Sequence, residues 1–232
     1  MGHWKFDEDR RGEVDDDSGN ELHGHFTSTL RGGAYHVGRG KFTRSLHFNG
    51  TGGMVNIAHK PGLNFGRNSF SFAGWTKVED FTYPMTSLAV KQGDGCFYEP
   101  NSTVATPGWD IGHGLNKDMT GFCIRDDQKR IARYRYIQHD KEFSHAKLLN
   151  KWTHYVIVFD RHAGKVFLYI NGKRQKDFED ISHVAGSIDN DKPLTFGFLY
   201  DWKLKGLIDE YRLYKGALQD SHVTLIFENH NI

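Results

Sequence analysis

The stretch Lys205-Gly206-Leu207-Ile208-Asp209-Glu210-Tyr211-Arg212-Leu213-Tyr214 has the alternation of a β-strand, with an acidic pair inside it. Apolar residues occupy both alternating sets of positions, which predicts a strand inside a layered sheet rather than a bare edge. The pattern directs Asp209 toward a core position. Because an unpaired buried charge is too costly to keep, we expect Asp209 to bind a metal ion or an arginine such as Arg212.

Short alternating runs of the same kind recur along the chain between turn residues, and helical periodicity is nearly absent. The runs predicted as strands are 46–57, 69–78, 152–159, 165–170 and 193–199. Asn171-Gly172 follows one of them and predicts a tight hairpin turn. The segment 219–228 is compatible with a helical turn or a last strand. The segment 92–120 is rich in Gly, Pro, Asn and Asp, and we expect a long functional loop there.

These elements predict an all-β fold, a two-sheet antiparallel β-sandwich of jelly-roll type. A length of 232 residues suits a single domain over 1–232. The formal charge of +1, from 30 basic and 29 acidic residues, gives no broad surface for nucleic acid or anionic membranes. No apolar run approaches the roughly 20 residues needed to span a bilayer, so membrane insertion is not expected.

The chain has two cysteines, Cys96 and Cys123, which lie 27 positions apart without a metal-binding motif. A disulfide between them would stabilise the fold by about 3 to 4 kcal/mol and would place the protein in an oxidising compartment. Two separate reduced thiols are the alternative, and the spacing leaves both open. No signal peptide precedes the first predicted strand, so we expect a mature or trimmed chain.

Seven passages in series resemble the laminin G-like, concanavalin A-like jelly-roll family. They are 3–8 (HWKFDE), 16–24 (DDSGNELHG), 46–50 (LHFNG), 70–75 (FSFAGW), 152–159 (WTHYVIVF), 168–172 (LYING) and 206–212 (GLIDEYR). The resemblance implies a concanavalin A-like sandwich over nearly the whole chain, and a secreted or periplasmic location within a larger secreted protein. The fold hosts lectins, carbohydrate-binding modules, adhesion domains, glycosidases and polysaccharide lyases, so it does not decide the function.

The resemblance also implies a structural calcium where the first strand meets the closing strand. Asp209 would supply the carboxylate, Asp7 or its carbonyl a second ligand, and the carbonyl near Asn49-Gly50 a third. Oxygen ligation suits calcium, and a glycine such as Gly50 lets the backbone approach. A second acidic run, 15–20, lacks the spacing of an EF-hand, and we expect a solvated turn there.

Hydrolases of this fold place an E-x-D-x-x-E or similar motif on a central strand, and no such motif occurs here. Glu79-Asp80 and Glu179-Asp180 are adjacent pairs that would point to opposite faces of a strand. Asp7 and Asp9 lie at the chain start. The sequence therefore argues against a retaining glycosidase, and whether the chain is an enzyme at all stays open, with a binding role favoured.

The segment 122–139 predicts a hairpin closed by 126–130. Matching its apolar faces places Arg125, Arg133 and Arg135 together on the opposite face, where they could hold carboxylates or sulfates. A solvated outer face is the alternative. One further reading is a polysaccharide lyase acting on a uronic-acid polymer, which needs a cation beside a Tyr or His base. Its candidate residues are Arg133, Arg135, Tyr134, Tyr136 and His139, with His145 nearby.

Aromatic residues beside polar groups are candidates for stacking on a sugar ring. Trp109 and Trp202, with Tyr98 and Tyr200, are expected in or beside loops. Asp110, Asn116 and His113 would hydrogen-bond the sugar. The alternative is that both tryptophans plug the ends of the core.

The sequence therefore predicts a lectin-like, carbohydrate-binding module for a polysaccharide, with an anionic glycan as one candidate ligand. A lyase is the first alternative, and a protein-adhesion or structural domain is the second. The ligand, the binding face and the oligomeric state do not follow from the sequence.

Overall fold

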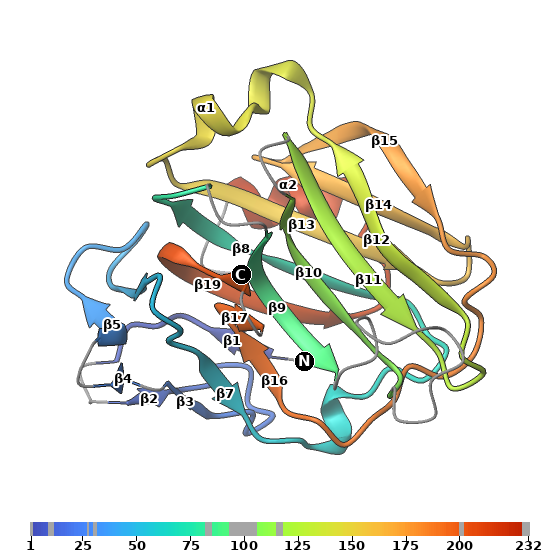
Figure 1. Ribbon diagram of the computed structural model, residues 1–232, viewed down its shortest axis with the longest axis horizontal. Helices are drawn as coiled ribbons and strands as arrows, with labels where there is room; N and C mark the ends of the chain where they lie inside the picture. Colours follow the sequence, from blue (N-terminus) through green and yellow to red (C-terminus); the bar gives the residue numbers. More distant parts are fainter. Residues whose placement is uncertain are drawn as a thin grey trace.

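The computed structural model describes residues 2–8, 12–26, 28–29, 32–81, 85–92, 106–114, 118–199 and 202–228. These residues form two antiparallel β-sheets packed face to face as an open sandwich (Figure 1), which confirms the predicted all-β jelly-roll class. None of the helices among them is long and apolar enough to cross a bilayer.

The first sheet has the strand order β15-β14-β13-β8-β19-β6-β5-β4, and β1 pairs with β19. Its strands are β1 (Gly2–Trp4), β4 (Ser28–Thr29), β5 (Gly32–Val37), β6 (Ser45–Asn49), β8 (Phe70–Val78), β13 (Thr153–Asp160), β14 (Lys165–Ile170), β15 (Lys173–Asp180) and β19 (Lys205–Lys215). The closing strand β19 therefore lies inside the sheet, between β6 and β8, as its two partly apolar faces predict.

The second sheet has the order β12-β11-β10-β9-β16-β7-β3-β2. Its strands are β2 (Glu13–Val14), β3 (Gly24–Phe26), β7 (Val55–Ile57), β9 (Met85–Gln92), β10 (Gly108–Gly114), β11 (Met119–Arg125), β12 (Ile131–Gln138) and β16 (Leu194–Phe196). A short ribbon pairs β17 (Phe198–Leu199) with β18 (Trp202–Lys203). The segment 92–120 is thus not one long loop, because β10 and the start of β11 lie within it.

The helical elements are short: η1 (Pro61–Leu63), η2 (Lys141–Phe143), α1 (His145–Leu148) and α2 (Asp220–Glu228). The helix α2 confirms the helical reading of 219–228. Its Val223 packs with Ala73, Val156 and Tyr169 on the outer face of the first sheet. The turn at Asn171-Gly172 has positive φ at both residues, 50° and 76°, as the predicted tight hairpin requires.

One apolar cluster fills the space between the sheets, and it includes Trp4 from the first strand and Leu213 from the closing strand. A register shift in β19 between Asp209 and Arg212, with Glu210 at a φ of 52°, interrupts the alternation. Ile208 and Tyr211 both belong to the core, so the bulge leaves Asp209 on the outer face. The prediction that Asp209 points into the core is wrong, because an extra residue at a β-bulge changes the facing pattern.

Candidate functional site

Asp209 and Asp7 hold the same turn, 40–44, against the closing strand. The Oδ2 atom of Asp209 accepts hydrogen bonds from the backbone N–H groups of Lys41 (2.7 Å) and Phe42 (3.2 Å). The Oδ1 atom of Asp7 accepts one from the N–H of Arg44 (2.8 Å). Asp209 is only 1% exposed. The two carboxylates therefore lie together beneath a loop on the outer side of the sheet.

The surroundings of Asp209 disfavour the ionised form of its carboxyl group. Burial raises its pKa to about 8; the N–H groups of Phe42 and Lys41 oppose this, and the carboxylates of Glu210 and Asp7 add to it. Within the described residues no basic side chain forms an ion pair with Asp209. Arg212, the predicted partner, pairs with Glu210 instead (2.9 Å). A cation at this position would relieve the repulsion.

The residues around Asp209 fit a calcium ion. A Cβ atom on Gly40 would lie 2.6 Å from Asp209 Oδ2 and 1.9 Å from the carbonyl oxygen of Arg44, so only glycine lets this turn approach. In the described part of the chain, the second oxygen of each carboxylate accepts no hydrogen bond. Carboxylate and carbonyl oxygens are the ligands that calcium prefers. The donor set and the close approach of the backbone are both suited to that ion.

Gly50 does not belong to this site. Asn49 pairs with Lys205, four positions along β19 from Asp209, and four residues of extended strand span about 13 Å. The predicted third ligand near Asn49-Gly50 is therefore wrong. The glycine whose backbone approaches Asp209 closely is Gly40.

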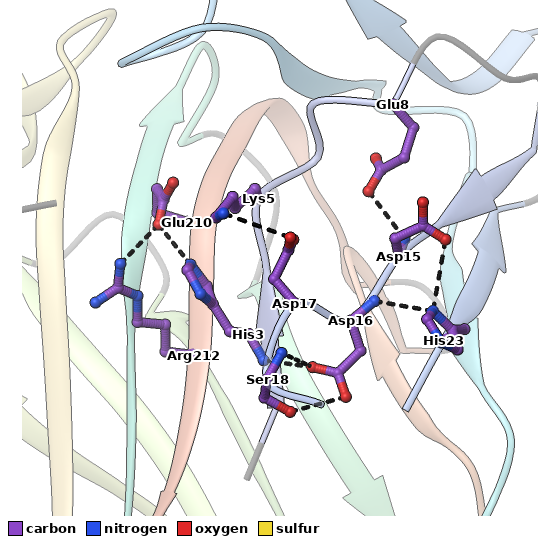
Figure 2. Close-up of polar contacts among 10 residues, drawn as sticks. All are labelled: His3, Lys5, Glu8, Asp15, Asp16, Asp17, Ser18, His23, Glu210 and Arg212. Carbon is purple, nitrogen blue, oxygen red and sulfur yellow. Dashed lines mark hydrogen bonds and ion pairs between the residues drawn. The ribbon is translucent and has the colours of Figure 1, made fainter. Parts of the chain in front are cut away.

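The acidic run 15–20 is a turn at the surface in which Asp17, Gly19 and Asn20 are exposed, as expected, while Asp16 is buried (Figure 2). The Asp16 carboxylate accepts hydrogen bonds from the N–H groups of His3 (2.9 Å), Ser18 (3.0 Å) and Leu22 (2.9 Å), and from the Ser18 hydroxyl (2.8 Å). Burial acts to raise the pKa of Asp16, but these hydrogen bonds lower it overall. Asp16 is therefore the one residue of the run that departs from the expected solvated position, and its carboxylate stabilises the turn.

A second polar network joins the chain start to the closing strand (Figure 2). Glu210 Oε2 lies 2.6 Å from His3 Nε2 and 2.9 Å from Arg212 Nη2. Burial acts to raise the pKa of Glu210, yet the hydrogen bonds and charges of His3 and Arg212 lower it overall. The strand pairing of β1 with β19 is thereby reinforced by side chains at the bulge.

The predicted hairpin is present, since β11 and β12 pair around the turn 126–130, but its three arginines do not share a face. Ile124 pairs with Ala132, whereas Phe122 pairs with Arg135 across a register shift. Arg135 therefore lies on the side of core-facing Phe122 and approaches Glu179 of β15 at 4.0 Å. The bulge removes Arg135 from the predicted anion-binding set. Arg125, on the other face, is 1% exposed.

The lyase candidates are not gathered at one place. Tyr136 lies near enough to Asp110, on the outer face, for that carboxylate to add to burial in raising its pKa. His139 lies between the sheets, near Tyr155 of β13. Arg133 lies within the register shift and Arg135 just after it, and the Tyr134 side chain lies outside the described residues. The two candidate bases that the structure describes, Tyr136 and His139, therefore lie on opposite sides of the second sheet.

Trp109 is a core residue, so the prediction that it stacks on a sugar is wrong. It belongs to β10, and its ring lies 5.1 Å from that of Phe70. Asp110 points to the opposite face but is also buried, with its Oδ2 atom bound to the amide of Gln92. Burial raises the pKa of Asp110 to about 7, and Oδ1 has no hydrogen-bond partner. Trp109 and Asp110 were expected in or beside a loop, and they are buried because they belong to strand β10 within 92–120.

Several candidates lie outside the described residues. They are Cys96, Tyr98, Asn116, Tyr200 and the side chain of Trp202. Cys123 is buried in β11 and is disulfide-bonded.

His113 lies in a buried cluster with His139 and His145. The three residues each offer a ring nitrogen, and these atoms lie within 4.8 Å of one another. His113 comes from β10, His139 follows β12, and His145 begins α1. The sequence predicts His113 as a sugar ligand and places His139 and His145 in the lyase alternative, but no spacing motif joins the three. Only the packing of the two sheets and α1 brings them together.

A polar groove that the sequence did not indicate lies at one end of the sandwich. It is formed by loops around 64–69, 160–162, 189 and 215–219. Its polar lining residues are Asn64, Asn68, Ser69, Asp160, His162, Asp189, Lys215 and Gln219. They come from loops and, for Asp160 and Lys215, from the last residues of β13 and β19, so no local pattern marks the residues as one site.

A family model described as the concanavalin A-like lectin/glucanases superfamily, of laminin G type, matches residues 49–224. The chain belongs to this family. That assignment confirms the resemblance seen in the sequence motifs. A comparison with curated protein sequences finds no match.

Among solved structures, the chain is similar to the binding domain of Paraclostridial Mosquitocidal Protein 1, with a TM-score of 0.71, 19% identity, and coverage of 97% of this chain and 51% of that one. The binding domain of Botulinum Neurotoxin serotype G gives a TM-score of 0.71 at 13% identity, with coverage of 98% and 50%. The serotype D ligand binding domain in complex with N-acetylneuraminic acid gives 0.68 at 15%, with coverage of 98% and 50%.

The chain thus spans about half the length of these domains. At such identities the similarity shows the fold, and a sugar bound by the whole serotype D domain is a property of that protein. The comparisons place the chain among the folds of binding domains without indicating its ligand.

Proposed function

We propose that this chain is a carbohydrate-binding module that holds a neutral glycan in the polar groove at the end of the sandwich. The family contains lectins by description, and the groove has the residue types that bind sugar hydroxyls. The observation that carries the proposal is the convergence of amides and carboxylates from four separate loops.

In each of two carboxylates of the groove, one oxygen atom accepts hydrogen bonds from neighbouring groups of the protein. Asp189 Oδ1 accepts a hydrogen bond from the N–H of Gly66 (2.6 Å). Asp160 Oδ1 accepts bonds from the N–H of Ala163 (3.0 Å) and the hydroxyl of Ser69 (3.3 Å). An oriented carboxylate offers its second oxygen to vicinal hydroxyl groups, and neighbouring amides add donors. These fixed groups lower the cost of ordering the site on binding.

The charge of the groove favours neutral over anionic glycans. Asp160 and Asp189 contribute two negative charges, and Lys215 contributes one positive charge. The anionic ligand considered from the sequence depended on three arginines on one face, and the bulge in β12 separates them. A uronate or sulfate would meet like charge in the groove.

A glycan array that carries neutral and acidic oligosaccharides tests this proposal, followed by calorimetry with the strongest ligand. We expect Asp189→Asn to weaken binding at least about tenfold, the loss of a hydrogen bond to a charged group, and Asn68→Ala to weaken it about fivefold, the loss of a neutral hydrogen bond. Gln128→Ala, in the exposed turn of the β11–β12 hairpin, should bind as the wild type does. Absence of binding to every glycan would refute the carbohydrate role, and release of an unsaturated product from uronic-acid polymers would indicate a lyase.

We also propose that Asp7 and Asp209 hold a calcium ion that stabilises the junction of the chain ends. When bound, the ion would supply positive charge beside two carboxylates that otherwise repel. Calcium titrated into metal-stripped protein should raise the melting temperature of the wild type and leave that of Asp209→Asn unchanged. Asp177→Asn, on exposed β15, should respond as the wild type does. An unchanged wild-type melting curve with no bound calcium would refute the site.

A further inference from the structure

We infer that His113, His139 and His145 form a site for a divalent transition metal, specifically Zn²⁺, between the two sheets. Their ring nitrogens lie within 4.8 Å of one another, and the three residues are 1%, 4% and 8% exposed, respectively. Imidazole nitrogen is a preferred ligand of zinc, and three histidines with one further position is a recurrent coordination set. The site is separate from the groove and from Asp209, and does not depend on either proposal.

His113 supplies the strongest evidence that the cluster lacks a component. Both of its ring nitrogens are buried without a hydrogen-bond partner, although an imidazole always carries a donor and an acceptor. Leaving such groups unsatisfied costs about 1 to 3 kcal/mol. A metal ion in the cluster would bind one of these nitrogens and so remove the free-energy cost of leaving that nitrogen unsatisfied.

His139 is oriented from outside the cluster. The Nδ1 atom of His139 lies 3.0 Å from the carbonyl oxygen of Phe143, which fixes Nδ1 as the protonated nitrogen and leaves the Nε2 lone pair available. That lone pair now meets the hydroxyl of Thr120 at 2.9 Å. Metal-bound histidines in proteins are held in this way by an acceptor on the opposite nitrogen.

Both ring nitrogens of His145 are likewise buried without a hydrogen-bond partner. Burial is the largest effect on the pKa of His145 and lowers it, while the charge of Asp118 and the backbone of Met119 act to raise it. Asp118 also accepts a hydrogen bond from the His145 N–H (2.5 Å), so its negative charge is fixed beside the cluster. Burial likewise lowers the pKa of His113 and brings that of His139 to about 4. The imidazoles are therefore neutral at pH 7, the form that binds metal.

The walls of the site are aromatic. The Phe81 ring stacks on that of His145 at 4.0 Å, and the Tyr155 ring lies 4.6 Å from that of His113. Burial raises the pKa of Tyr155, so its phenol stays protonated and does not supply an anionic ligand. Water is the simplest fourth ligand. The enclosed position indicates that the metal stabilises the sandwich by joining β10, the end of β12 and α1.

Zinc titration of the metal-stripped chain, followed by calorimetry and mass spectrometry, tests this inference. We expect one zinc per chain, a higher melting temperature, and at least a tenfold loss of affinity in His145→Gln. The matched control is His154→Gln, because His154 is equally buried but packs on Trp75 outside the cluster. It should keep wild-type affinity. Thr120→Val removes only the competing hydroxyl, and should bind zinc at least as well as the wild type.

X-ray absorption of the zinc-loaded wild type requires no variant, and should show about three imidazoles at roughly 2.0 to 2.1 Å. The inference is overturned if wild-type protein binds no zinc, if His145→Gln keeps wild-type affinity, or if absorption shows fewer than two imidazoles. Because glycan binding is measured separately, failure here would leave the groove proposal unaffected.

Discussion

Buried carboxylates in this protein are stabilised in three different ways. Asp16 accepts four hydrogen bonds and has a lowered pKa. Glu210 pairs with His3 and Arg212. Asp110 has only the Gln92 amide as a side-chain partner among the described residues, and its pKa is raised. The same chemical group is therefore ionised or protonated near neutral pH according to how many donors reach it.

Asp110 gives the chain a pH-dependent stability of known sign. Its pKa is raised from 3.8 to about 7 in the folded state, so between those values the native state binds a proton that the unfolded state has lost. Stability should fall as pH rises through this range, by up to about 1.4 kcal/mol per pH unit. Urea unfolding of wild type and Asp110→Asn across the range measures the effect. Asp209, whose pKa is also raised, contributes a slope of the same sign in both proteins. Asp110→Asn should therefore have a shallower slope than the wild type and be the more stable at the upper end; parallel curves would contradict this.

At the scale of elements, two of the β-bulges decide which face the predicted Asp209 and Arg135 side chains take. The bulge in β19 leaves Asp209 outside the core while returning Tyr211 to it, and the bulge in β12 separates Arg135 from Arg133. The strands themselves follow from alternation, and β14 coincides with the predicted run 165–170. The sequence could not predict which face of the sheet the side chains take after a bulge. Strict alternation assumes that every residue is paired, and an unpaired extra residue reverses the faces of those that follow.

The β14–β15 turn also positions the helix α2. Gly172 has a φ of 76°, and a Cβ atom there would lie 2.9 Å from Phe227 Cδ1 of α2. Gly172→Ala should therefore destabilise the fold by about 1 to 2 kcal/mol, the usual cost of a left-handed L-residue, and loosen α2. Chemical unfolding and hydrogen exchange of α2 measure both effects. Gly62→Ala is the control, since open space surrounds it. Equal stability of the two variants would be contrary to expectation.

At the scale of the whole molecule, the first strand, β1, is part of the core. The indole of Trp4 on β1 donates to the carbonyl of Leu22 (2.9 Å) and packs edge-on against Phe196 of the second sheet at 5.1 Å. The N-terminal strand therefore joins both sheets to the closing strand.

Trp4→Ala should cost about 3 to 5 kcal/mol, because it leaves a large cavity between the sheets. Tyr35→Ala, at a side chain that is 46% exposed, should cost less than about 1 kcal/mol. Guanidinium unfolding of the two variants beside wild type makes the comparison. Similar losses at Trp4 and Tyr35 would show that the first strand is not an integral part of the core.

The sequence by itself determined the sandwich class, the family, most long strands and the Asn171-Gly172 turn, because alternation and turn chemistry are local properties. It also indicated that Asp7 and Asp209 belong together, through the family resemblance. Only the tertiary structure showed that Gly40, and not Gly50, lies beside Asp209, that the three histidines form one cluster, and that a groove lies at the end of the sandwich. Those sites join residues from distant strands and loops, and their proximity depends on sheet order, bulges and burial, none of which has a signature within a short stretch of chain.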